Sequence, residues 1–239
     1  MPDAVILCGG RGTRLGALTQ ETPKPLLLID NAPFLFHLLS RLHSEGFRRF
    51  VLAVHYLAEQ FGSFQDRYQK IFPGIQIVLE KEPLGTGGAL KNAALHVQSE
   101  IFVALNGDSY VPQIFSPILT EHREKKRVFT MVAVQSDGVE GGIRNKGGLE
   151  LAADGEICRF SGHQSVDENW INSGMYVASR KKILSWPEGR YDLENRLDSL
   201  LKPDKAYAFR SLKPLLDIGT PECFTVAQYK LKSFKEKRS

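Results

Sequence analysis

The stretch Ala4-Val5-Ile6-Leu7-Cys8-Gly9-Gly10-Arg11-Gly12-Thr13-Arg14 decides how the rest of the chain is read. Its first four residues form an apolar run typical of a buried strand, and this run stops abruptly at a glycine-rich loop. The loop glycines leave the backbone N–H groups free to approach an anion closely. Arg11 and Arg14 add fixed positive charge in a fork geometry that suits phosphate oxygens. The stretch therefore predicts a site for a polyphosphate.

Lys24 lies between Pro23 and Pro25, which stiffen the segment that presents it. The loop is not a Walker loop, because no Gly-Lys-Ser/Thr follows it. It also lacks the Gly-x-Gly-x-x-Gly spacing of Rossmann dinucleotide sites. Glycines alone would equally suit a plain strand-to-helix connection, so the functional interpretation depends on the cations beside them.

Composition places the chain among ordinary globular proteins. It has 239 residues, 42% of them hydrophobic and 24% charged, which suits one domain with a sizeable core. Part of the net charge of +4 comes from the C-terminal tail (Lys230, Lys232, Lys235, Lys237 and Arg238). Because no broad basic field exists elsewhere, a nucleic-acid partner is not indicated.

Neither secretion nor membrane insertion is indicated, because we find no leader pattern and no run of about 18 apolar residues. We therefore expect a cytoplasmic protein. The three cysteines are far apart and form no Cys-x-x-Cys pair, so neither disulfides nor zinc are expected. Cys8, beside the glycine loop, is interpreted as a small apolar residue.

Strand and helix patterns alternate over the first half of the chain. Apolar runs at 49–54, 75–79 and 101–105 predict strands, and helical spacing over 34–42, 57–68 and 86–96 predicts helices between them. This alternation predicts an α/β fold: a Rossmann-like mixed, mostly parallel sheet with helices on both faces. Ligands in such sheets bind at the carboxyl ends of the strands.

The second half is richer in strands. We expect strands at 128–135 and 170–177 and a hairpin of 147–151 with 153–157 through Asp154-Gly155. Helices are expected at 180–186 and 193–201, a short strand at 206–209, and a final helix from Thr220.

Two aspartates stand at predicted strand ends. Asp108 follows the apolar strand 101–105 directly after Asn106-Gly107, and Asp217 lies in the apolar stretch Leu216-Asp217-Ile218. Mg²⁺ prefers a few carboxylates together with phosphate and water oxygens, so this pair predicts a magnesium site. Asp108 could instead form an Asx-Gly turn, and Asp217 could cap the last helix, although Thr220 is better placed for capping.

Three stretches together resemble sugar-1-phosphate nucleotidyltransferases. Gly9-Gly10-Arg11-Gly12-Thr13-Arg14-Leu15 with Pro23-Lys24-Pro25-Leu26 is similar to the signature of that family. Glu80-Lys81-Glu82-Pro83-Leu84-Gly85-Thr86-Gly87-Gly88-Ala89-Leu90 resembles the base-binding segment of its guanylyl and uridylyl members, and Asn172-Ser173-Gly174-Met175-Tyr176 resembles the strand that borders the sugar. The resemblance covers residues 4–225, and within the family it is greatest to bacterial D-glycero-α-D-manno-heptose 1-phosphate guanylyltransferases.

The resemblance implies transfer of a nucleotidyl group from a nucleoside triphosphate to a sugar 1-phosphate, with release of pyrophosphate and with Mg²⁺ as cofactor. It implies one domain, 1–239, with a nucleotide-binding half (1–110), a sugar-binding half (111–225) and a basic C-terminal segment (226–239). The implied nucleotide residues are Leu7, Gly9, Gly10, Gly12, Thr13, Arg14, Glu80, Pro83, Gly85 and Thr86. The implied catalytic residues are Arg14, Lys24 and Asp108, the metal ligands are Asp108 and Asp217, and the sugar residues are Asn106, Gly148, Asn172 and Gly174.

The chain departs from the family at one point. Many relatives have Glu-Lys-Pro before the sugar strand, and that lysine holds the sugar phosphate, whereas Phe160-Ser161-Gly162-His163-Gln164 contains no lysine. Three replacements for that lysine stay open: His163, Lys146, or a larger share of the phosphate contact for Lys24.

The chemistry of Glu80 favours GTP. A carboxylate only accepts hydrogen bonds, and guanine offers two adjacent donors where uracil offers one.

Mannose 1-phosphate and N-acetylmuramate 1-phosphate stay open as substrates, and a homodimer stays open as the assembly. A non-catalytic nucleotide sensor of the same fold would be expected to lack the aspartates, and a glycosyltransferase would normally show Asp-x-Asp, which Asn106-Gly107-Asp108 does not.

Overall fold

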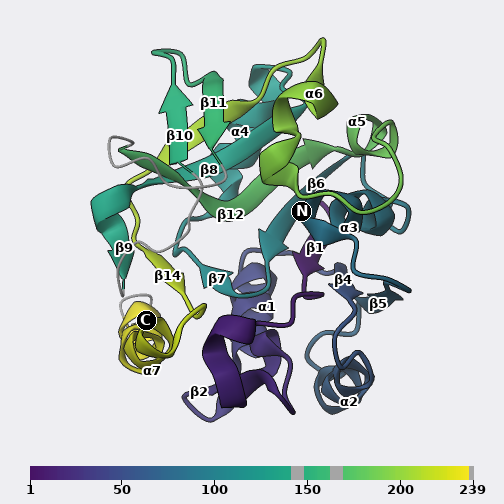
Figure 1. Ribbon diagram of the computed structural model, residues 1–239, viewed down its shortest axis with the longest axis vertical. Helices are drawn as coiled ribbons and strands as arrows, with labels where there is room; N and C mark the ends of the chain where they lie inside the picture. Colours follow the sequence, from purple (N-terminus) through teal and green to yellow (C-terminus); the bar gives the residue numbers. More distant parts are fainter. Residues whose placement is uncertain (141–147, 162–168, 237–239) are drawn as a thin grey trace.

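In the computed structural model, which describes residues 1–140, 148–161 and 169–236, one mixed sheet runs through the chain (Figure 1). Its strand order is β11-β10-β12-β6-β1-β4-β5, with β8 paired to β12 and β13 paired to β8. The pairs β1–β4, β1–β6 and β4–β5 are parallel, and β12 runs antiparallel to both β6 and β8. The predicted α/β fold with a mixed sheet is confirmed.

The first half follows the predicted alternation. Its main elements are β1 (Ala4–Leu7), α1 (Phe34–Ser44), β4 (Phe50–Val54), α2 (Glu59–Tyr68), β5 (Ile75–Leu79), α3 (Gly85–Ala94) and β6 (Ile101–Asn106). Between β1 and α1 lie the 3-10 segments η1 (Thr13–Thr19) and η2 (Lys24–Leu26) and the short strands β2 (Leu28–Ile29) and β3 (Ala32–Pro33). The register places Leu7 opposite both Ala53 and Asn106, so these strands end at one edge of the sheet.

The second half adds the antiparallel part of the sheet. Its elements are β7 (Ser109–Tyr110), α4 (Phe115–Glu124), β8 (Phe129–Gln135), η3 (Ser136–Gly138), β9 (Val139–Glu140), β10 (Gly148–Leu151), β11 (Ile157–Ser161), β12 (Trp170–Ser179), α5 (Arg180–Leu184), η4 (Leu193–Asn195), α6 (Leu197–Leu201), β13 (Tyr207–Ser211), β14 (Leu215–Asp217) and α7 (Pro221–Glu236). Within the described part of the chain, we find no helix with the length and apolar character needed to cross a bilayer.

Three sequence-based expectations need correction. The hairpin pairs β10 with residues 157–161, not 153–157, because residues 152–156 form the turn that closes it. The helix expected at 193–201 is broken at Arg196, whose φ of −134° is not helical. Helix α4 was not expected at all, although Phe115, Ile118 and Leu119 follow the i, i+3, i+4 spacing of a buried helical face.

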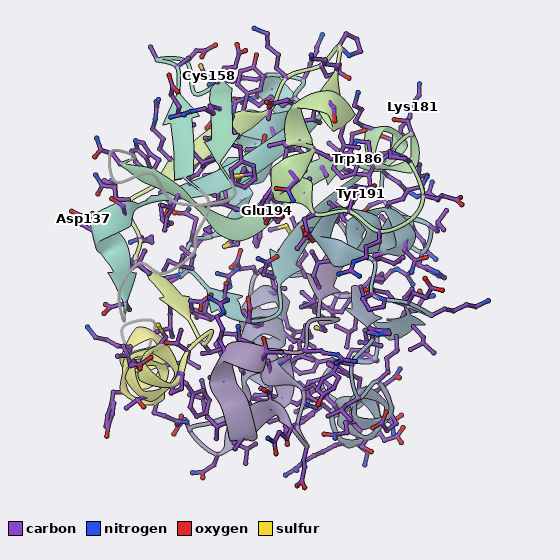
Figure 2. All side chains as sticks on the ribbon, in the orientation of Figure 1. Asp137, Cys158, Lys181, Trp186, Tyr191 and Glu194 are labelled. Atoms are coloured by element: carbon purple, nitrogen blue, oxygen red, sulfur yellow. The ribbon has the colours of Figure 1, made fainter. Side chains whose placement is uncertain are left out.

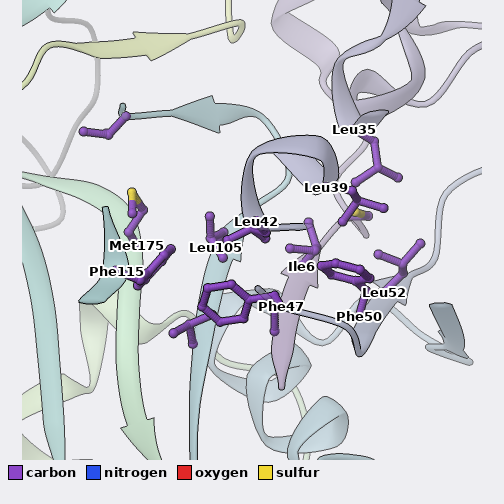
Figure 3. Close-up of a cluster of buried hydrophobic side chains, with 14 of the residues drawn as sticks. Ile6, Leu35, Leu39, Leu42, Phe47, Phe50, Leu52, Leu105, Phe115 and Met175 are labelled. Atoms are coloured by element: carbon purple, nitrogen blue, oxygen red, sulfur yellow. The ribbon is translucent and has the colours of Figure 1, made fainter. Parts of the chain in front are cut away.

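The core lies on both faces of the sheet. On one face Ile6, Leu52 and Leu105 pack against the α1 residues Leu35, Leu39 and Leu42 (Figure 3). On the other face Val5, Val51 and Ala104 pack against Leu90, Ala93 and Ala94 of α3. Burial on both sides explains why β1, β4 and β6 are continuous apolar runs and not alternating ones. Helices therefore cover both faces, as predicted.

A small second sheet attaches the end of the chain to this edge. Strand β14 lies between β7 and β9, and Asp217 pairs with Ser109. Helix α7 begins just after it, where the Thr220 side chain accepts a hydrogen bond from the Cys223 N–H at 3.2 Å. Thr220 is thus the helix cap, as expected, and Asp217 is left for another role.

The fully buried Phe50, which contacts the Phe72 ring edge-to-face at 6.0 Å, tests the contribution of this core. We expect Phe50→Ala to lower the free energy of unfolding by about 3 to 5 kcal/mol, because it removes buried area and leaves a cavity. Leu79→Ala on neighbouring β5, where the side chain is 61% exposed, should change it by less than about 0.5 kcal/mol. Chemical denaturation measures both, and similar losses for the two variants would contradict the assignment of the core.

Candidate active site

The strand ends of β1, β5 and β6 border two adjoining cavities. The larger, of about 580 Å³, is lined by Leu7, Gly9, Gly10, Arg11, His55, Glu80, Pro83, Leu84, Gly85, Thr86, Ala89, Asn106, Asp108, Arg190 and Asp192. The smaller, of about 250 Å³, is lined by Leu7, Cys8, Gly10, Gly12, Thr13, Arg14, Lys24, Pro25 and Asp108. Leu7, Gly10 and Asp108 are common to both, so the two cavities share a wall.

The glycine loop lines the smaller cavity because its backbone turns sharply there. Gly12 has φ +65°, and a Cβ on it would lie 3.1 Å from the Thr19 side chain and 3.2 Å from Lys24 Cβ. A larger residue would push Lys24 away, so glycine is required by both conformation and space. Cys8 is buried beside the loop, and burial raises the pKa of its thiol, which agrees with an apolar and not a nucleophilic role.

Lys24 and the two aspartates form one charged cluster. Lys24 Nζ is 2.6 Å from Asp108 Oδ2, and the lysine is only 5% exposed. The Ser109 hydroxyl lies between the aspartates, 3.1 Å from Asp108 Oδ1 and 3.3 Å from Asp217 Oδ2. Buried charges persist only when they are paired, so this ion pair compensates the desolvation of Lys24.

Gly219, which the sequence analysis did not single out, lies beside this cluster. Its N–H donates to Asp217 Oδ1 at 2.6 Å. A Cβ there would lie 2.4 Å from Asp217 Oδ1, 3.3 Å from Lys24 Nζ and 3.4 Å from Arg14 Nη2. A side chain at 219 would fill the space on which Arg14, Lys24 and Asp217 converge, and it is this space that an anion or metal ion would occupy.

The donor set suits a magnesium ion bound with phosphate. Asp108 and Asp217 are brought together as predicted, and among the described residues no group of three or more His, Cys, Asp or Glu side chains gathers to enclose a metal. Mg²⁺ is usually held by one or two carboxylates and completes its shell with water and substrate phosphates. Asp108 lines the cavity that Arg14 and Lys24 also line, and Asp217 joins Asp108 through the Ser109 hydroxyl, so the pair matches that requirement.

Glu80 is a buried acceptor at the larger cavity. It is 4% exposed; its Oε2 accepts the Leu84 N–H at 3.2 Å, whereas its Oε1 has no hydrogen-bond partner among the described residues. Burial raises the pKa of Glu80, partly offset by the Leu84 N–H and by nearby His55. A Cβ on Gly9 would lie 3.1 Å from this unpaired oxygen, so the glycine keeps space beside it. An unsatisfied buried carboxylate oxygen is costly, which points to a ligand that donates to it.

Two of the glycines that open α3 pack closely against another segment of the chain. A Cβ on Gly87 would lie 2.4 Å from the Tyr191 ring, and one on Gly88 only 2.2 Å from Gly189 O. The Gly87 N–H donates to Tyr191 O at 3.1 Å. These glycines make room for the segment 189–193, where Figure 2 labels Tyr191 beside α3. Gly85 makes room for the same segment, since a Cβ on it would lie 2.6 Å from both Tyr191 O and Asp192 Oδ1, and it also lines the larger cavity.

The same segment supplies residues that the sequence analysis missed. Arg190 and Asp192 line the larger cavity, and Asp192 Oδ1 accepts the Thr86 N–H at 3.3 Å. The Thr86 hydroxyl donates to Glu194 at 2.8 Å and accepts the Leu193 N–H at 2.8 Å. No local pattern indicated this, because residues 189–194 reach the cavity only through contacts with a helix about 100 residues earlier. His55, Leu84 and Ala89 were also missed: His55 follows a predicted strand, Leu84 precedes α3 and Ala89 lies within it.

The predicted sugar residues divide into separate groups. Asn106 lines the larger cavity, and a Cβ on Gly174 would lie 2.6 Å from its Nδ2. Asn172 is buried and occupied within its own strand: its amide donates to Tyr176 Oη at 2.8 Å and its oxygen accepts the Gly174 N–H at 2.8 Å. Gly148 is buried in β10 opposite Ile171, and it is not among the described residues that line either cavity.

Two further candidates, Lys146 and His163, lie outside the described residues. The replacement for the missing lysine of the Glu-Lys-Pro motif therefore stays a prediction.

The family model for nucleotidyl transferases matches residues 3–233, and the chain belongs to that family. It is 30% identical over 235 residues to the D-glycero-α-D-manno-heptose 1-phosphate guanylyltransferase of Aneurinibacillus thermoaerophilus, covering 97% of this chain and 99% of that protein. It is 32% identical to the mannose-1-phosphate guanylyltransferase of Mycobacterium tuberculosis, covering 93% of this chain but only 62% of that longer protein.

Comparison with solved structures supports the same family assignment. The crystal structure of HddC from Yersinia pseudotuberculosis superposes with a TM-score of 0.82 at 29% identity, covering 96% of this chain and 99% of that one. The same protein complexed with GMP-PN gives a TM-score of 0.79 at 28% identity, covering 95% and 99%. The expectation of a sugar-1-phosphate nucleotidyltransferase is thereby confirmed at the level of the family.

The packing of α3 against the segment 189–193 can be tested with glycines in two helices. Gly88→Ala should displace that segment, lower stability and weaken nucleotide binding, because its methyl group would lie 2.2 Å from a backbone oxygen. Gly62→Ala on α2, where nothing lies within 4 Å, should raise the free energy of unfolding by roughly 0.5 to 1 kcal/mol through helix propensity. Denaturation and nucleotide titration measure both effects, and a stabilised Gly88→Ala protein would disprove the contact.

Proposed function

We propose that this protein transfers GMP from GTP to a sugar 1-phosphate, with D-glycero-α-D-manno-heptose 1-phosphate as the preferred acceptor. The observation that supports this most is that the two cavities share a wall. The smaller cavity is lined by Arg14 and Lys24 and suits a triphosphate. The larger cavity contains the unpaired Glu80 oxygen and suits guanine. The heptose 1-phosphate guanylyltransferase that matches over nearly its whole length supports the choice of sugar.

The main barrier to the reaction is the repulsion between two polyanions, so bringing them together matters more than a strong base. An oxygen of the sugar phosphate attacks the α-phosphorus of GTP, a new P–O bond forms, and the bond to the β-phosphate breaks to release pyrophosphate. The attacking phosphate is already anionic, so positioning and charge neutralisation dominate. The loop N–H groups from Gly9 to Thr13 and the Arg14 guanidinium take the β- and γ-phosphates, and Lys24 lies between the reacting phosphates.

Asp108 and Asp217 would hold Mg²⁺, which supplies positive charge against the phosphate oxygens when it is bound. Lys24 is paired with Asp108 at 2.6 Å, so the ammonium already neutralises the carboxylate that would receive the metal. Lys24 stands beside that carboxylate, where its ammonium would also face a phosphate oxygen of the substrates.

The two halves of the chain would divide the substrates between them. In the nucleotide-binding half, 1–110, Glu80 accepts N1–H and the amine of guanine, and Leu7, Pro83, Gly85 and Thr86 surround base and ribose. In the sugar-binding half, 111–225, Arg190 adds a cation to the larger cavity, and we propose it as a further contact for the sugar phosphate. Asn106, from the strand end between the halves, would bind sugar hydroxyls.

A matrix of four nucleoside triphosphates against heptose, mannose, glucose and N-acetylmuramate 1-phosphates tests the proposal through pyrophosphate release. We expect GTP with a manno-configured sugar 1-phosphate to give the fastest turnover. Asp108→Asn should lower this turnover by at least about 100-fold, as expected for removing a metal ligand at a phosphoryl centre. No pyrophosphate from any pair would favour a nucleotide sensor, and transfer from a ready-made nucleotide sugar would favour a glycosyltransferase.

Glu80→Gln tests the base assignment. Replacing the carboxylate removes a charged acceptor for two guanine donors, so kcat/KM for GTP should fall about 10- to 100-fold while that for UTP changes less. The wild-type affinity for GTP should also fall as pH drops through the raised pKa of Glu80, because the protonated carboxyl no longer accepts both donors. Glu80→Gln cannot titrate there, so it should lack this component. Unchanged selectivity for GTP over UTP would refute the role of Glu80.

A further inference from the structure

The glycine loop is exposed on its ligand side, so something behind it must hold it in shape. Gly10, Arg11, Thr13 and Arg14 are all exposed, whereas Thr19, at the end of η1, is 3% exposed. The Thr19 hydroxyl donates to Gly12 O at 3.0 Å and lies 3.4 Å from Gly16 O. Both glycines have positive φ, so the loop contains two positions of high backbone freedom.

Thr19 is itself anchored by a residue at the end of β4. The Tyr56 hydroxyl lies 3.0 Å from Thr19 O and 2.9 Å from Gln20 O, so its single proton is shared between two carbonyls. The Tyr56 ring also lies under the loop, with Arg11 Cζ 5.7 Å from its centroid. A neighbouring contact, from Gln60 Nε2 to Glu21 O at 2.6 Å, extends the anchor along the same stretch.

We propose that Tyr56 is a positioning residue that shapes the triphosphate loop from behind, without contacting the nucleotide itself. This rests on the proposed function, because it assigns the loop to the β- and γ-phosphates of GTP. Tyr56 follows His55, whose Nδ1 is 2.9 Å from Glu80 O, so two consecutive residues reach the base end and the phosphate end of the site. The end of β4 thereby fixes the loop relative to Glu80 before the nucleotide binds.

The position of Tyr56 predicts an effect confined to the phosphates. In Tyr56→Phe, the affinity for GTP should fall about 2- to 10-fold, the value of one hydrogen bond, while the affinity for GMP stays unchanged because GMP has no β- or γ-phosphate. Tyr56→Leu also removes the ring beneath Arg11 and should weaken GTP binding several-fold further. Calorimetric titration without sugar phosphate measures both nucleotides. Tyr229→Phe, which alters a tyrosine 75% exposed on α7, is the matched control and should bind both like wild type.

A second measurement needs no ligand. Trypsin cleavage after Arg11 and Arg14 in the nucleotide-free protein should be faster in Tyr56→Phe than in wild type or Tyr229→Phe, because the loop opens more often. Equal losses for GTP and GMP, an unchanged GTP affinity, or an unchanged cleavage rate would each overturn the proposal. If wild type bound no GTP, the proposed function would be wrong, and the cleavage comparison alone would decide whether Tyr56 holds the loop.

Discussion

The parallel pairing of β1 between β4 and β6 is the constraint on which the site depends. Leu7 stands opposite Ala53 on one side and Asn106 on the other, so the loops that follow these strands leave the sheet at the same edge. That edge brings together the glycine loop, His55 and Asp108. The register is held by burial on both faces of the strands, where residues such as Ile6 and Val5 pack against helices on opposite sides.

Electrostatics then organises what the sheet brings together. Lys24 is nearly buried, and its ion pair with Asp108 makes that burial tolerable. Asp217 joins the cluster through Ser109 and is oriented by the Gly219 N–H. Cations and carboxylates held side by side are suited to reactants that are themselves highly negative, because the site presents neutralising charge without having to rearrange.

Glycine has two separate roles around the cavities. Gly9 and Gly219 keep space beside Glu80 and beside the cluster of Lys24 and Asp217, where a ligand would bind. Gly87 and Gly88 instead allow the segment 189–193 to pack on α3. In this way a stretch similar to a base-binding motif also builds the wall that presents Arg190 and Asp192 to the larger cavity.

The sequence alone determined the α/β class, the strands of the first half, the position of the glycine loop with its cations, and the two aspartates as candidates. These follow from local patterns, since apolar runs, glycine and proline positions act over a few residues. Only the tertiary structure decided that Asp217 meets Asp108 through the β7–β14 pair, that residues 189–193 border the larger cavity, and that Tyr56 lies behind the loop. These contacts join segments tens to more than a hundred residues apart, and they depend on how whole faces pack, which no local pattern encodes.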